Sequence, residues 1–511
     1  MKIERTKNVV RSTVFGFASK VINIVLPFVS RTVILYVLGD QYLGLSSLFV
    51  SILSFLSLAE LGMGSAMVYS MYKPIAQNDN KTICALLNMY RRFYRLIGCV
   101  ITLIGLAVLP LLNLLVKEEL PPDVNIYWLY LIYLLNTVLS YFLFAYKLSV
   151  LQAYQRNDIE SKISMFVTTL SYIVMLTVLL VTKNYYAYII CMPLFTIITN
   201  IIRLIYVNRH YPQLKPAGEV EPELKKSITK KVSALIGTKL NTVVINAADN
   251  IVIAAFFSIS TIAMYGNYYY ILSSITGFLG ICYGAMTAGL GNSLQTETIE
   301  KNYNDFLKFS FINAWLIGWC SICFVCLYQP FMLLWVGEEL MFPFYIAVEF
   351  AIYFYVYQIR KIPVVYKDAA GIWWEDRFRP YVCMSINVVL NLILVQIIGV
   401  SGIILSTVIS LCVSIPWENY MIFKHIFHCN SKTYYLKMSF YAFITVLICI
   451  ATYSLCSLLD NSPIAFFAKL GICLVVPNLM FILLYHKLRE FSEAKALLMR
   501  IVLKNKKEQM I

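Results

Sequence analysis

Charged residues are scarce in this chain. They make up 14% of its 511 residues, whereas a soluble globular protein contains about 25%. Hydrophobic residues account for 60%. A chain with so little charge cannot cover a water-exposed surface, so the composition excludes an ordinary soluble protein and predicts a polytopic membrane protein.

Histidine and enzyme motifs are also scarce. The only histidines are His210, His425, His428 and His486, all at expected cytoplasmic ends of spans, and none is paired with a serine or cysteine nucleophile. No P-loop is present, so the chain has no ATP motor of its own. The longest stretch expected outside the cell, Lys117–Val124, is too short for the active site of a polymerase or ligase. These absences argue against an enzyme.

Cysteine is present but not in a ligand pattern. The 13 cysteines stand singly in apolar runs, and no pair has metal-ligand spacing with a histidine nearby. Cys320, Cys323 and Cys326 share one face of a helix, but no histidine or acid lies among them. We therefore expect these three to be small apolar packing residues.

Hydrophobic runs long enough to span a membrane, which needs about 20 residues, recur along the whole chain. They predict fourteen helices, at residues 13–38, 42–70, 93–116, 125–150, 163–182, 185–207, 233–257, 261–290, 307–329, 341–360, 380–399, 402–423, 436–458 and 463–485. An even number of spans places both termini on the same side.

Basic residues alternate from loop to loop. The chain has 42 Lys and Arg residues, and all but Lys117, Lys183, Lys469 and Arg31 lie in or beside the termini and the even-numbered loops. This is the positive-inside pattern, which predicts that both termini are cytoplasmic. The net charge of +15 is thus explained by topology, and nucleic acid is not an expected partner.

A polar stripe runs along the first hydrophobic segment. Its members are Lys20, Asn23, Pro27 and Arg31. Their spacing of three or four residues places them on one helical face. The same spacing recurs in the seventh segment, at Lys239, Thr242, Asn246 and Asn250, with Asp249 alongside.

Two interpretations of these stripes remain open. Polar residues can join two helices, and lysines near helix ends, such as Lys20 and Lys239, can reach the interface. For Arg31 and Asp249 we favour a water-filled cavity, because a charge at bilayer depth costs at least about 2.5 kcal/mol on insertion scales.

Two other segments carry charge in unusual places. Glu60 falls well inside the second span, where it could lock two helices together, balance Arg31 or couple transport to a cation. The loop of residues 366–380 is rich in Trp and charge. We expect it to lie at the interface with its basic residues on lipid phosphates; contact with a phosphate-bearing substrate is the alternative.

The chain divides at a linker rich in Pro and Glu, residues 212–223. Six spans precede it, and six more plus two extra follow. We predict an N-lobe at 1–210, a cytoplasmic linker at 211–232, a C-lobe at 233–430, and helices 13–14 with a basic tail at 431–511. Parallel six-helix repeats are common in transporters and hold the substrate between the halves.

Four sequence pieces together resemble one family. They are Arg31 with the following LGDQYLGLSSLFVSIL, the run AELGMGSAMVYSMYKPIA from Ala59, the pair Asp249-Asn250 with the later MYGNYYYI, and KDAAGIWWEDRFRP from Lys367. The chain resembles the polysaccharide-transporter branch of the MOP (multidrug/oligosaccharidyl-lipid/polysaccharide) exporter superfamily. Within it, the likeness is to Wzx-type flippases of bacterial capsule, exopolysaccharide and O-antigen clusters.

The resemblance implies an all-α membrane protein with about 14 helices, in which two MATE-like six-helix lobes surround a central cavity and two C-terminal helices are appended. It implies a flippase that moves undecaprenyl-diphosphate-linked oligosaccharide across the bacterial plasma membrane by alternating access. The implied partners are that lipid, membrane lipids, a polysaccharide polymerase and a chain-length regulator. No cofactor is expected, and coupling to H⁺ or Na⁺ remains open.

The expected cavity residues come from two sources. The family match points to Arg31, Glu60 and Asp249. The stripe argument adds Lys20, Asn23, Lys239, Asn246 and Asn250. A peptidoglycan-precursor (lipid II) flippase and a cation-coupled drug exporter are the alternatives. Such exporters usually carry an acid in the first helix, and this chain has none between Val14 and Leu38.

Overall fold

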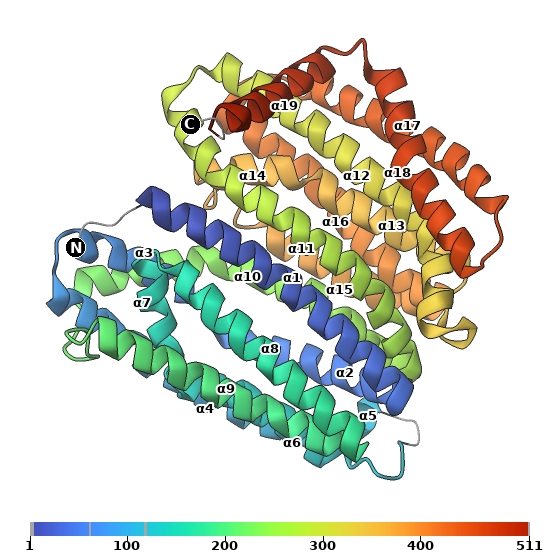
Figure 1. Cartoon of the computed structure of the whole chain (residues 1–511). Coiled ribbons are helices and arrows are strands. Elements are labelled where there is room, and N and C mark those ends of the chain that lie inside the picture. Colours follow the sequence, from blue (N-terminus) through green and yellow to red (C-terminus); the bar gives the residue numbers. More distant parts are fainter. Residues whose placement is uncertain (1–4, 61–62, 117–119, 509–511) are drawn as a thin grey trace. The chain divides into compact units, whose positions relative to one another are not determined.

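The computed structural model describes residues 5–60, 63–116 and 120–508, and every regular element in these ranges is a helix (Figure 1). The helices up to residue 256 are α1 (Arg5–Val37), α2 (Asp40–Leu56), η1 (Ser57–Glu60), α3 (Met63–Ala76), α4 (Asn80–Val108), η2 (Leu109–Leu111), α5 (Leu112–Leu115), α6 (Ile126–Phe142), η3 (Ala145–Lys147), α7 (Leu148–Ala153), α8 (Asn157–Thr182), α9 (Tyr185–His210) and α10 (Pro222–Phe256).

The later helices are α11 (Ile259–Thr296), α12 (Ile299–Val336), η4 (Glu338–Leu340), α13 (Phe344–Ile359), α14 (Lys361–Ala370), α15 (Arg379–Ile398), α16 (Val400–Ile422), η5 (Phe423–Phe427), α17 (Lys432–Ser457), α18 (Pro463–Tyr485) and α19 (Arg489–Glu508). Helices occur in all fourteen predicted spans. Ten helices in the described ranges are long and apolar enough to cross a membrane. The all-α polytopic fold class is therefore confirmed.

The chain forms two compact units, Met1–Gly266 and Asn267–Ile511. In the first unit α1 packs on α8, α6 on α9, and α10 on α2. In the second, α12 packs on α13, α17 and α18, and α15 packs on α16. The predicted lobe boundaries at residues 210 and 430 stay a prediction.

The second predicted span is interrupted. Helix α2 ends at Leu56, a 3-10 turn covers Ser57–Glu60, and α3 begins at Met63. Glu60 falls inside the predicted span, as expected, and it is the last residue of the 3-10 turn that follows α2. Tyrosine hydroxyls pack around this break, and a Cβ at Gly64 would lie 2.9 Å from the Tyr90 hydroxyl.

Prolines interrupt several membrane helices. Pro27 lies within α1, Pro330 within α12 and Pro477 within α18. Each proline lacks the N–H that would bond the carbonyl four residues earlier. In a bilayer a freed carbonyl has to find another donor. For Pro477 the freed carbonyl is that of Cys473, which accepts a hydrogen bond of 2.9 Å from Trp319 Nε1.

A buried network of charges holds the second unit together between α13 and α16. Arg360, after α13, donates to both oxygens of Glu418 on α16, at 3.1 and 2.7 Å. Arg379, at the start of α15, bonds Glu418 at 3.0 Å and Asp376 at 2.8 Å. Lys367 on α14 bonds Asp376 at 2.7 Å. Because Glu418 is fully buried, these contacts replace its hydration.

This network corrects one expectation for the loop of residues 366–380. Lys367 and Arg379 are only 4% and 3% exposed, so these two residues bind carboxylates and not lipid phosphates. Trp373 and Trp374 do remain exposed, and the Arg377 guanidinium stacks 4.3 Å from the Trp374 ring. Only this outer part of the loop is suited to the interface.

We predict that Glu418→Gln destabilises the protein by about 3–5 kcal/mol, because it removes the fully buried carboxylate that pairs with both Arg360 and Arg379. The measurement is thermal unfolding of the purified protein in detergent. Glu493→Gln is the matched control, since its partner Arg489 is 72% exposed and such a pair contributes at most about 1 kcal/mol. Equal losses in both variants would contradict the role of the network.

The same network predicts a pH dependence. Burial raises the pKa of Asp376, but the hydrogen bonds and charge of Arg379, together with Lys367, outweigh burial and hold the pKa below its usual value. The stabilisation is then fully present above the unfolded-state pKa of about 4 and is lost as the pH falls through the lower folded-state pKa. We expect the melting temperature of the wild type to decrease when the pH is lowered under about 4. The melting temperature of Asp376→Asn should decrease less steeply over the same pH range. Parallel curves would contradict this assignment.

Candidate functional site

Two of the three residues to which the family resemblance points, Arg31 and Asp249, lie beside the same dipeptide, Tyr265-Gly266, in α11. The Tyr265 hydroxyl donates a hydrogen bond of 2.6 Å to Asp249 on α10, and Asp249 is buried. A Cβ added at Gly266 would lie 3.0 Å from Nη2 of Arg31 and 3.4 Å from the Ser47 hydroxyl. The missing side chain at Gly266 thus leaves room for the Arg31 guanidinium.

A third predicted residue joins from α10. Asn250 donates a hydrogen bond of 2.9 Å to the hydroxyl of Ser51, which lies one turn beyond Ser47 on α2. Arg31, Asp249 and Asn250 therefore gather around α2 and the start of α11. We call these three residues, with Ser47, Ser51 and Tyr265, the Arg31 cluster.

Close helix packing positions this cluster. A Cβ at Gly44 on α2 would lie 2.2 Å from the backbone oxygen of Ile259, which is nearer than any real contact. Only glycine permits α2 to approach the start of α11 so closely. The Gly44 position therefore sets how near Ser47 and Ser51 come to Tyr265 and Gly266.

We predict that Gly44→Ala destabilises the protein by about 1–3 kcal/mol or more, because the added methyl group has to displace backbone. Gly16→Ala on α1 is the control, since a Cβ there meets nothing within 4 Å. Melting of both variants in detergent is the measurement. A Gly44→Ala protein as stable as Gly16→Ala would contradict the close approach.

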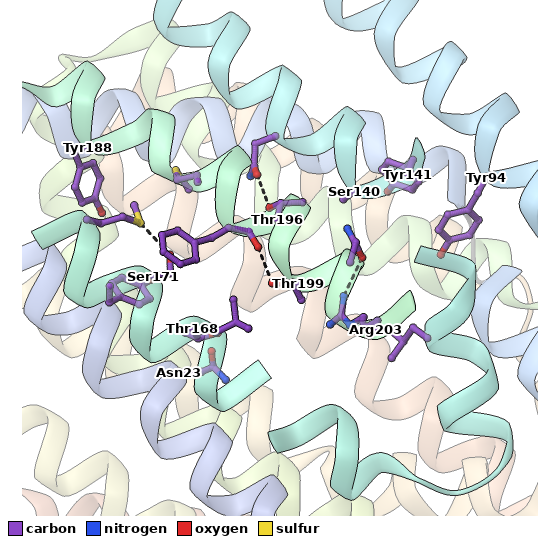
Figure 2. A pocket seen from close by; sticks show the side chains of 18 of the residues that line it. Asn23, Tyr94, Ser140, Tyr141, Thr168, Ser171, Tyr188, Thr196, Thr199 and Arg203 are labelled. Carbon is purple, nitrogen blue, oxygen red and sulfur yellow. Dashed lines mark hydrogen bonds between the residues drawn. The ribbon is translucent and has the colours of Figure 1, made fainter. Parts of the chain in front are cut away.

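A separate pocket of 670 Å³ lies within the first unit, among α1, α6, α8 and α9 (Figure 2). Most of its polar lining is neutral. The amide, serine and threonine residues are Asn23, Asn136, Ser140, Thr168, Ser171, Thr196, Thr199 and Asn200, and four tyrosines add further hydroxyls. Such groups both donate and accept hydrogen bonds. We call this space the N-unit pocket.

Glu60 is one of the residues that line the N-unit pocket, and its carboxylate accepts hydrogen bonds from tyrosines. Tyr94 on α4 and Tyr141 on α6 both donate hydrogen bonds to its carboxylate. Tyr90 in turn donates to Tyr94 at 2.8 Å. Arg31 is not among the residues that line this pocket. The structure thus places Glu60 with α4 and α6, and it does not bring Glu60 into the Arg31 cluster.

Arg203 on α9 provides the other charge of the N-unit pocket. Its guanidinium forms a two-pronged ion pair with Glu160 on α8, with Nε 3.0 Å from one carboxylate oxygen. It also donates to Asn200 at 3.3 Å. The sequence reasoning missed Arg203, although it is the only charged residue within the predicted span 185–207 and could have been found by that signal.

Asn23 is the stripe residue that reaches the N-unit pocket. Because Pro27, four residues later, has no N–H, the backbone carbonyl of Asn23 has no intrahelical donor. The Asn23 side chain donates to the Ser19 carbonyl at 2.7 Å. Asn23 and Arg31 therefore face different surroundings, the pocket and the Arg31 cluster. The predicted stripe does not line a single space.

The remaining predicted residues contribute less. Lys20 is partly exposed on α1, without a described role in either site. Lys239 and Asn246 belong to α10, but their side chains lie outside the described residues. The structure thus brings Arg31, Asp249 and Asn250 together, and places Asn23 and Glu60 in the N-unit pocket.

The long apolar helices, with polar groups packed between them, define the fold of a multi-pass, all-helical membrane protein. No family model matches the sequence, and comparison with curated protein sequences finds no match. Solved structures do match. The inward closed conformation of the lipid II flippase MurJ is 15% identical, with a TM-score of 0.66, and the match covers 93% of this chain and 99% of MurJ.

Two MATE transporter structures are similar as well. An inward-facing multidrug resistance MATE transporter of the MOP superfamily is 14% identical, has a TM-score of 0.58 and covers 79% of this chain and 94% of its own. A mutant of the Vibrio cholerae MATE transporter VcmN is 14% identical, with a TM-score of 0.55, over 83% of this chain and 98% of its own. At these identities the likeness shows a shared fold, and the expected MOP/MATE-like fold is confirmed.

Proposed function

We propose that this chain is a flippase that moves undecaprenyl-diphosphate-linked oligosaccharide from the inner to the outer leaflet of the bacterial plasma membrane by alternating access. The observation that carries the proposal is the neutral amide and hydroxyl lining of the N-unit pocket. Sugars need many donors and acceptors and little charge, and a pocket of 670 Å³ falls in the usual range of about 300–1,000 Å³ for ligand sites.

The charges of the N-unit pocket support a neutral ligand. Arg203 is paired with Glu160, and Glu60 accepts hydrogen bonds from two tyrosines. A glycan can bind beside such satisfied groups without displacing them. A cationic drug would instead need a carboxylate that is free to pair with it.

The Arg31 cluster is suited to the diphosphate. An arginine guanidinium binds phosphate oxygens in a two-pronged geometry, and Ser47 and Ser51 add hydroxyl donors on the adjacent helix. Asp249, which accepts a hydrogen bond from Tyr265, would help to keep α10 and α11 together around this site. The prenyl chain would remain in lipid, against the apolar outer faces of the helices.

The structural comparisons support a transporter and leave the substrate as our proposal. MurJ is a lipid II flippase and the MATE structures are multidrug transporters, so both alternatives share the fold. The first helix favours the lipid-linked sugar, because it carries Lys20 and Arg31 and no acid between Val14 and Leu38. Glu60 is our candidate for H⁺ or Na⁺ coupling, and a polysaccharide polymerase and a chain-length regulator are the proposed partners.

The test uses a flippase-null bacterium that makes the lipid-linked oligosaccharide. An impermeant lectin or glycosidase on spheroplasts reports how much of it reaches the outer leaflet. We expect the wild type to restore delivery and Arg31→Ala to reduce it at least about tenfold, the loss of one charged phosphate contact. Exposed Arg209 provides the control, and Arg209→Ala should behave as the wild type.

Two outcomes would overturn the proposal. Failure of the wild type to move the oligosaccharide would remove the assigned substrate, and full delivery by Arg31→Ala would remove the role of the Arg31 cluster. Rescue of cells depleted of their lipid II flippase would point to the peptidoglycan precursor. Efflux of a fluorescent cationic dye would point to a drug exporter.

A further inference from the structure

Three cysteines from distant parts of the sequence meet inside the second unit. They are Cys326 on α12, Cys456 on α17 and Cys473 on α18, and their sulfur atoms all lie within 4.8 Å of one another. They are 3%, 2% and 0% exposed. The sequence predicted that Cys326 is a packing residue among Cys320 and Cys323. The structure instead gives it two thiol neighbours from other helices.

Proline positions shape the helices around these thiols. Pro330 follows Cys326 by four residues, and Pro477 follows Cys473 by four. Both helices therefore lack a backbone hydrogen bond at the level of the cluster. The bond from Trp319 on α12 to the freed Cys473 carbonyl joins α18 to α12 at that level. The two helices are thus held together beside the thiols by a contact that does not use the sulfur atoms.

We propose that Cys326, Cys456 and Cys473 form a binding site for a soft monovalent d10 cation, with Cu(I) as the natural ligand. Sulfur ligands select soft ions such as Cu(I) over Na⁺, Mg²⁺ or Ca²⁺, which prefer oxygen. Structural Zn²⁺ sites use four ligands, and this group of described residues supplies three. An ion about 2.3 Å from each sulfur needs sulfurs about 4 Å apart, which requires only a small contraction.

A buried lysine balances part of the charge of such a site. Lys469 is 4% exposed and lies one helical turn before Cys473 on α18. Its ammonium donates to Asn461 at 2.8 Å and interacts electrostatically with the Cys456 thiol. When Cu(I) binds, each of the three thiols loses its proton to solvent, because the thiolate is the metal ligand, and no electron is transferred. The three thiolates and Cu(I) carry a net charge of −2, and the Lys469 ammonium balances one of these two negative charges.

Binding would also join helices. Cys326 belongs to the long helix α12, whereas Cys456 and Cys473 belong to α17 and α18, which follow the predicted C-lobe. A bound ion would connect these three helices through metal–sulfur bonds. Because it binds the folded state, it would raise the melting temperature in proportion to its affinity and concentration.

The test uses the full chain, purified in detergent, reduced and freed of metal. It is titrated anaerobically with Cu(I) against a chromophoric Cu(I) chelator, and melting is recorded at one equivalent. We expect the wild type to keep one equivalent of Cu(I) from the chelator. This bound Cu(I) should raise the melting temperature of the protein. Each of Cys326→Ser, Cys456→Ser and Cys473→Ser should lose that equivalent while melting like the metal-free wild type.

Matched controls separate this site from the other thiols. Cys99 and Cys282 are exposed, and Cys99→Ser and Cys282→Ser should retain the equivalent. Lys469→Met should weaken Cu(I) binding about tenfold through loss of the balancing charge. The proposal is overturned if the wild type withholds no Cu(I), or if the same equivalent persists in all three cluster variants. A disulfide between two of the three cysteines in protein isolated from cells would overturn it as well.

Discussion

The requirement that every backbone polar group find a partner inside a bilayer governs this molecule. It leaves helices as the spanning element for a chain with so few charges, and helices occur in each predicted span. It also means that each proline inside a helix leaves the carbonyl four residues earlier without its usual hydrogen bond, so that this carbonyl needs another donor. Asn23, Cys326 and Cys473 occupy such positions. One of them borders the N-unit pocket and two belong to the thiol cluster, so three of the helix interruptions coincide with candidate sites.

Polar groups inside the two units are satisfied in different ways. In the first unit, tyrosine hydroxyls surround Glu60, and Glu160 neutralises Arg203. These arrangements leave a lining of amides and hydroxyls that a neutral, oxygen-rich ligand can use. In the second unit, Glu418 and Asp376 bind three cations in a closed network. That network links several helices and offers no free group, which fits a structural role better than a substrate site.

The likeness to both a lipid II flippase and multidrug transporters means that the fold alone does not select a substrate. Selection has to come from side chains. The first helix carries Arg31, which favours an anionic headgroup; an acid at this place would suit a cation instead. The neutral N-unit pocket favours a glycan. The two features lie on the same helix α1, eight residues apart at Asn23 and Arg31. The proposed substrate carries both a sugar and a diphosphate, and it would use both features.

Composition and periodicity alone determined the class of this protein, because scarcity of charge and long apolar runs permit only membrane helices. They also pointed to Arg31, Asp249 and Asn250 as candidates, since a polar residue in an apolar helix is conspicuous, and the structure places these three close together. They could not show that Asn23 and Arg31 face different surroundings, because one helical face can pass along several neighbours. Nor could they find Glu160 opposite Arg203, Glu418 between two arginines, or Cys326 beside Cys456 and Cys473. Those pairings join residues from different helices, and only tertiary packing decides which distant helices touch.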